Sequence, residues 1–157
     1  MTTTIIERRR VEYATLAEFL DDAEQTAARE HQTAGNWTYG QILEHLTTAI
    51  NSSIDGFSFR GPWLIRKLVA PFIKNSLLTK PIKPGFRLPK SAESYLPSAD
   101  ATTEDALKNL RTAIARIAVE KPEAEHPLLG PLTDEEWKAL HLRHAELHMS
   151  FVVPASE

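Results

Sequence analysis

The sequence predicts an all-α protein, a bundle of helices, on three observations. Four segments begin with a threonine that is followed three positions later by an acid or an amide, the capping arrangement of a helix N-terminus. Each segment continues with apolar residues at helical spacing over three or more turns. Alternation typical of a strand is faint and confined to residues 8–13. With 157 residues, 42% apolar and 25% charged, the chain fits a single domain, residues 1–157.

The first two predicted helices begin at Thr15 and Thr38. Thr15 pairs with Glu18 and opens the segment LAEFLDDAEQTAARE, while Thr38 pairs with Gln41 and opens YGQILEHLTTAINSSIDG. We expect the second helix to stop at Gly56, because glycine commonly ends a helix.

The third and fourth predicted helices begin at Thr102 and Thr133, with Asp105 and Glu136 as their capping partners. They continue as ALKNLRTAIARIAVE and EWKALHLRHAELHMSFV. Each is expected to end before a proline, which cannot continue a helix.

Between the second and third of these helices, the sequence predicts an extra short helix and a Pro-rich excursion. The segment PWLIRKLVAPFIKNSLL has weaker helical character and is expected to break or kink near Pro71. Residues 81–97 follow with no regular period. We interpret them as an ordered excursion over the bundle surface, because a long structureless loop is uncommon in a compact domain unless it covers a site.

Residues 57–92 form a basic segment without a single Asp or Glu. Its eight basic residues are Arg60, Arg66, Lys67, Lys74, Lys80, Lys83, Arg87 and Lys90. Such a segment attracts an anionic substrate, an anionic thiol cofactor or a membrane surface, or it caps the bundle with its cations solvated. We favour the solvated cap.

Composition excludes several classes of function. Without cysteine the chain has no disulfide, no thiolate catalysis and no Cys-based metal site, so histidine and carboxylate are its strong metal ligands. The N-terminus lacks the apolar run of a secretory signal and no window has transmembrane character, so we expect a cytoplasmic protein. A net charge of −3 and a pI near 6.1 argue against a nucleic-acid partner.

Histidines gather on one face of the last predicted helix. At about 100° per residue, Trp137, His141, His144 and His148 fall within an arc of roughly 60°. His144 and His148 stand at i and i+4, a spacing by which two imidazoles converge on one metal ion. The zincin motif does not apply, because Ala145 follows the first histidine of the pair. Chance pairs at this spacing also occur, so a structural role stays open.

The best third ligand is His45, at the edge of the apolar stripe of the second helix. A histidine in such a place is often a hydrogen-bonded core residue instead. Three neutral imidazoles leave at least one position for water, as in catalytic metal sites. Gln41, Ser52 and Trp137 are expected around that position, and His141 is a fourth ligand, a hydrogen-bond donor to a ligand or a substrate contact.

Two runs, GNWTYGQILEHLTTAINSSIDGF and HPLLGPLTDEEWKALHLRHAELHMSFV, carry a family resemblance. The chain resembles the DUF1569 family of the DinB-like superfamily over most of its length. The resemblance implies a four-helix bundle with up-down-down-up topology. It also implies one divalent metal ion, nickel or zinc before manganese or iron, held by a histidine of the second helix and an HxxxH pair of the last. Those positions correspond to His45, His144 and His148.

Members of that superfamily include thiol-dependent S-transferases and maleylpyruvate isomerases. We therefore expect a metal-dependent enzyme acting on a small molecule, either a transferase that uses a low-molecular-weight thiol or a hydrolase. The alternative is a non-enzymatic ligand-binding or sensor protein on the same fold. No spacing requires a general base, and Glu44 is expected on the polar side of its helix. The sequence does not decide whether the chain forms a homodimer, and it disfavours peripheral contact with a membrane.

Overall fold

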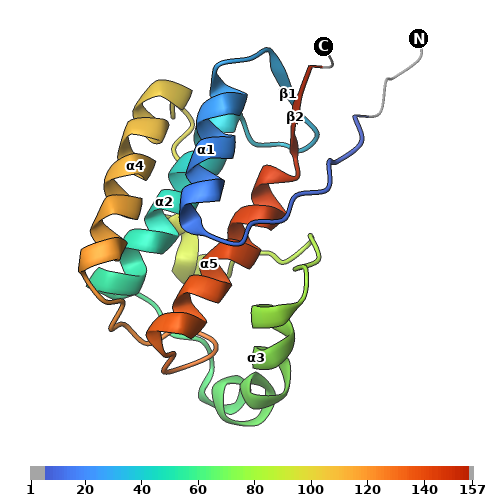
Figure 1. Ribbon diagram of the computed structural model, residues 1–157. Coiled ribbons are helices and arrows are strands. Elements are labelled where there is room, and N and C mark those ends of the chain that lie inside the picture. The colour runs from blue at the N-terminus through green and yellow to red at the C-terminus, as the bar shows by residue number, and fades with distance from the viewer. Residues whose placement is uncertain (1–5, 156–157) are drawn as a thin grey trace.

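Helices make up most of the chain in the computed structural model, which describes residues 6–155 (Figure 1). The five α-helices of this part are α1 (Leu16–Ala27), α2 (Tyr39–Asp55), α3 (Ala70–Thr79), α4 (Thr103–Val119) and α5 (Asp134–Met149). A π-helical turn, η1 (Ile65–Val69), leads into α3, and a 3-10 helix, η2 (Lys90–Tyr95), lies within the Pro-rich excursion. The all-α prediction is therefore confirmed, apart from a small sheet.

That sheet joins the segment after α1 to the segment after α5. Strand β1 (His31–Thr33) pairs antiparallel with β2 (Val152–Pro154). α1 stops at Ala27 and α5 at Met149, each before the end of the segment expected to be helical, and the strands follow. The faint alternation at residues 8–13 does not form a strand, since this segment runs without a sheet partner beside α5. Pairing of distant segments is a tertiary contact, which local periodicity does not encode.

All four predicted helix starts are confirmed. The hydroxyls of Thr15, Thr38, Thr102 and Thr133 each accept a hydrogen bond from the backbone N–H three residues later. Thr38 and Thr133 complete the reciprocal capping box, which satisfies donors that a helix start otherwise leaves unpaired. Gly56 ends α2 with φ of 105°, a conformation that favours glycine.

The main core lies where α1, α2, α4 and α5 bury their apolar faces against one another. Each of these helices contributes a large apolar side chain that is completely buried: Phe19, Leu43, Leu110 and Met149. A smaller second core joins α3 to the first half of α5 through Ala70, Leu129, Trp137 and Leu140. No helix within residues 6–155 has both the length and the apolar content needed to cross a membrane.

Charged groups tie the N-terminal segment to the body of the fold. Arg9 makes a bidentate ion pair with Asp22 of α1 and donates to the carbonyl of Val152. The buried carboxylate of Glu146 accepts hydrogen bonds from Tyr13 N–H and from Arg143. The start of the described chain is thereby held across α5.

Gly40 offers a test of the packing between α2 and α4. A Cβ at this position would lie 2.5 Å from the carbonyl oxygen of Ala101 and 2.7 Å from the carbonyl carbon of Thr102, both backbone atoms. Helix propensity alone predicts that Gly40→Ala stabilises by about 1 kcal/mol. We expect the opposite sign, a loss of roughly 1–3 kcal/mol in the free energy of unfolding by urea titration, because the two backbones must separate. The exposed Asn109→Ala on α4 is the control, expected to change stability by less than about 0.5 kcal/mol.

Candidate metal centre

Three histidines from two helices meet in the seam between α2 and α5. One ring nitrogen from each of His45, His144 and His148 lies within 4.8 Å of the others. His144 is central, since its Nε2 is 3.1 Å from Nε2 of His45 and 3.1 Å from Nε2 of His148. His45 is buried, while His144 and His148 stay partly exposed, so the cluster lies near the surface. The structure thus brings together the three residues chosen from the sequence.

The Pro-rich excursion fixes the tautomer of His45. Its Nδ1–H donates to the backbone carbonyl of Tyr95 at 3.1 Å, at the end of η2. A neutral imidazole carries one ring hydrogen, so Nε2 of His45 presents a lone pair to the cluster. A carbonyl that holds the outer nitrogen of a metal-binding histidine is a common arrangement in metalloproteins.

Trp37 forms a wall beside the cluster. Its ring stacks on His148 with centroids 5.5 Å apart and an interplanar angle of 17°, and it lies 4.9 Å from the ring of His45. It immediately precedes the cap of α2, so the same turn that starts this helix positions the indole. Packing on both rings restricts their rotation.

The imidazoles are held neutral. Burial lowers the pKa of His45, although the hydrogen bond to Tyr95 opposes that shift. The pKa of His144 lies well below its usual range because of burial and then of its neighbours His148 and His45. Burial, with the charges of His45 and Arg8, lowers the pKa of His148 to about 3. Neutral imidazoles are the form that binds metal.

Hydrogen bonds alone do not satisfy this cluster. With a lone pair on His45 Nε2, the 3.1 Å contact to His144 needs a hydrogen on Nε2 of His144. That hydrogen cannot also serve the 3.1 Å contact to His148, so only one of the two contacts is an ordinary hydrogen bond. Nitrogens bound to tetrahedral zinc lie about 3.3 Å apart, close to these separations. The donor set therefore fits a divalent metal ion.

His141 lies outside this cluster and contacts a different residue of α2. Its Nε2 lies 3.0 Å from Oγ of Ser53, whose own hydrogen is donated to the carbonyl of Ile50. His141 must therefore be the donor, and its hydrogen sits on Nε2. Trp137 stacks on its ring at 5.4 Å and is itself buried. In the described residues, His141 does not join the group of three converging ring nitrogens.

The other predicted pocket residues have varied surroundings. Gln41 is occupied in the cap of α2, accepting from Thr38 N–H and donating to the carbonyl of Ser98. Ser52 is partly exposed on α2, next to the serine that holds His141. Glu44 accepts two hydrogen bonds from Ser98, one from its backbone and one from its hydroxyl.

Sequence reasoning missed Tyr95, Trp37 and Ser53. Tyr95 acts through a backbone carbonyl, which leaves no side-chain signal in the sequence. Trp37 stands beside a recognised helix cap, and that position was the available signal. Ser53 is one residue away from the predicted Ser52, an error within the uncertainty of helical phase over two turns.

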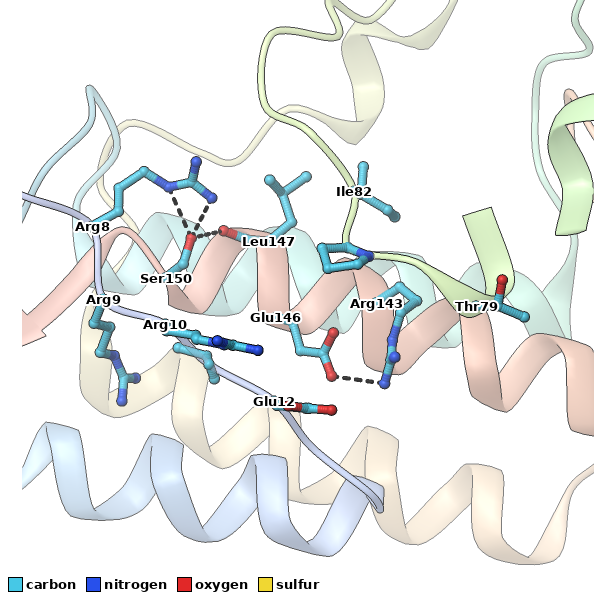
Figure 2. Close-up of a pocket in the computed structure, with 12 residues that line it drawn as sticks. Arg8, Arg9, Arg10, Glu12, Thr79, Ile82, Arg143, Glu146, Leu147 and Ser150 are labelled. Carbon is cyan, nitrogen blue, oxygen red and sulfur yellow. Dashed lines mark hydrogen bonds and ion pairs between the residues drawn. The ribbon is translucent and has the colours of Figure 1, made fainter. Parts of the chain in front are cut away.

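A separate cavity of about 360 Å³ lies on another face of α5 (Figure 2). The N-terminal segment, the chain after α3 and α5 form its walls. Arg8 donates to Oγ of Ser150 there, and Arg143 pairs with Glu146 at 2.7 Å. The three clustered histidines are not among its lining residues.

Fold and site together define a helical protein with a three-histidine cluster suited to a metal ion. The profile of the family described as "Protein of unknown function (DUF1569)" matches residues 5–155, and the chain belongs to this family. No curated protein and no solved structure shows a significant match.

Two histidines outside the cluster, the buried His141 and the half-buried His126, should make stability depend on pH. Burial lowers the pKa of His141 to about 3 and that of His126 to about 4. Both stay neutral in the folded protein at pH 5, whereas the unfolded chain takes up protons below its pKa of about 6.5. The free energy of unfolding should fall as pH drops from about 6.5 toward 4, by up to about 1.4 kcal/mol per pH unit for each histidine.

Urea unfolding of the metal-free protein at a series of pH values measures this slope. His141→Gln keeps a donor for Ser53 but cannot titrate, so its slope should be shallower than that of the unmodified protein. An equal slope in both proteins contradicts the assignment.

Proposed function

We propose that this chain is a single DinB-like domain that binds one divalent metal ion through His45, His144 and His148. Convergence of three neutral imidazoles on one point, with His45 held in one tautomer by Tyr95, carries the proposal. The shared core of α1, α2, α4 and α5 supports a four-helix bundle, for which the family resemblance implies up-down-down-up topology. Nickel and zinc are the ions we favour, since imidazole suits both.

The function this geometry supports best is a metal-dependent transferase that uses a low-molecular-weight thiol. A metal with three histidine ligands and an open position supplies Lewis acidity, which lowers the pKa of a bound thiol or water. The protein's residues orient the site: Tyr95 fixes His45, and Trp37 covers His148 and excludes water from that side. Hydrolysis of a small molecule is the related reaction that the same site supports.

One observation favours a non-enzymatic ligand-binding protein instead. Glu44, the carboxylate next to His45 in the sequence, is engaged by both the backbone and the hydroxyl of Ser98. This engagement does not leave it poised to take a proton from a bound molecule. Metal binding is common to both functions, so the site is tested first and the reaction second.

Removing one ligand tests the site. We expect His144→Ala to weaken nickel or zinc binding by about 100-fold or more in isothermal titration of the apo protein, because the central ligand is lost. His31→Ala, in β1, is the matched control and should bind as tightly as the unmodified protein. Equal loss in both variants, or no loss in His144→Ala, rules out this ligand set.

A thiol titration separates the two functions. Nickel-loaded protein should develop a near-ultraviolet absorption band on addition of N-acetylcysteine, because a thiolate bound to nickel gives a charge-transfer transition. The S-methyl thioether of the same compound cannot ionise and should give no such band. Metal binding without any response to the thiol favours the ligand-binding protein over the transferase.

A further inference from the structure

The helical segment of residues 63–79, which includes η1 and α3, is oriented with apolar side chains outward. Phe72 is 84% exposed, Trp63 62%, Leu68 61% and Leu64 58%. Leu64, Leu68 and Phe72 follow one another at intervals of four residues, so they share one face of the segment. Exposed single apolar residues are normal on a protein surface, but a contiguous group of this size marks an interaction site.

Basic side chains on the opposite face hold the segment in this orientation. Arg66 pairs with Glu125 at 3.0 Å, and Lys74 pairs with Glu136 at the start of α5 at 2.9 Å. Between them Ala70 is buried in the second core. The sequence favoured a cap with solvated cations. The structure instead turns two of these cations inward and leaves the large apolar residues outside.

The remaining cations of the basic segment follow the apolar face along the chain. Lys80, Lys83, Arg87 and Lys90 make no ion pair with any acid of residues 6–155, and Lys67 lies over the ring of Trp63 at 5.4 Å. No acid occurs anywhere in residues 57–92. Phe86, 69% exposed, adds a further aromatic ring between two of these cations in the sequence. A partner with both apolar and negatively charged groups fits this surface, because Lys67 lies at its edge and residues 57–92 carry no acid.

We propose that this surface binds the interface of an anionic lipid bilayer. Tryptophan, phenylalanine and leucine on one side of a helical segment, with Lys67 at its edge and further basic residues next in the chain, match the profile of such an interface, apolar below and negative above. Figure 1 shows α3 and the turn before it at one end of the molecule, away from α1 and α4, where a flat surface can reach them. A second copy of the chain fits less well, because a two-fold contact sets these cations against themselves.

Vesicle sedimentation tests the proposal with the full-length protein. Vesicles of phosphatidylcholine with about 30% phosphatidylserine should bind it, and vesicles of phosphatidylcholine alone should bind it much more weakly. Binding should weaken as salt increases, because salt screens the cations. Absence of binding to the anionic vesicles at low salt overturns the proposal.

Two pairs of variants separate the apolar and electrostatic contributions. Leu68→Ser with Phe72→Ser changes only exposed side chains and should abolish sedimentation, whereas Val119→Ser, 84% exposed on α4, should not. Lys80→Gln with Lys83→Gln should weaken binding by about 25-fold, since each basic residue near an anionic surface contributes a factor of about five. Lys108→Gln with Lys121→Gln removes the same charge elsewhere and should have a much smaller effect.

Self-association is measured alongside by analytical ultracentrifugation. A dimer that Leu68→Ser with Phe72→Ser dissociates, together with no vesicle binding, assigns the surface to a second copy and overturns the membrane proposal. Equal sedimentation by the patch variants and their controls also overturns it. The proposal does not rest on the metal site, so His144→Ala should sediment with anionic vesicles like the unmodified protein.

Discussion

Burial of one face of α2 is the constraint on which the rest of the structure depends. Ile42, Leu43, Leu46 and Ile50 are each at most 3% exposed, and the helix packs against both α4 and α5. Close approach of α4 is possible because Gly40 has no Cβ to meet the backbone before α4. With α2 packed in this way, the edge of its apolar face lies against α5. His45, on that edge, therefore lies beside the histidine pair of α5.

The histidines packed between α2 and α5 differ in how their ring nitrogens are satisfied. His45 donates to Tyr95, and His141 donates to Ser53, so both rings have defined tautomers. Between His45, His144 and His148, the available hydrogens do not satisfy both short contacts. Buried polar groups in native proteins are rarely left in conflict. A metal ion is the simplest group that removes it.

The first half of α5 links the candidate metal centre to the exposed apolar surface. Trp137 stacks on His141 on one side and belongs to the small core that holds Ala70 of α3 on the other. Glu136, beside it, is also the ion-pair partner of Lys74. Through these contacts, a shift of α3 on binding another surface is transmitted to α5, the helix that carries His144 and His148.

The sequence by itself determined the features that depend on residues close together in the chain. Hydroxyl caps located the starts of α1, α2, α4 and α5, because capping is a contact over three residues, and helical phase grouped His144 with His148. Tertiary structure decided what depends on distant segments: the β1–β2 pair that follows α1 and α5, the carbonyl of Tyr95 on His45, and the partner of His141. It also decided which face of α3 points outward. That choice rests on ion pairs to Glu125 and Glu136, far along the chain, and no periodicity within residues 57–92 encodes them.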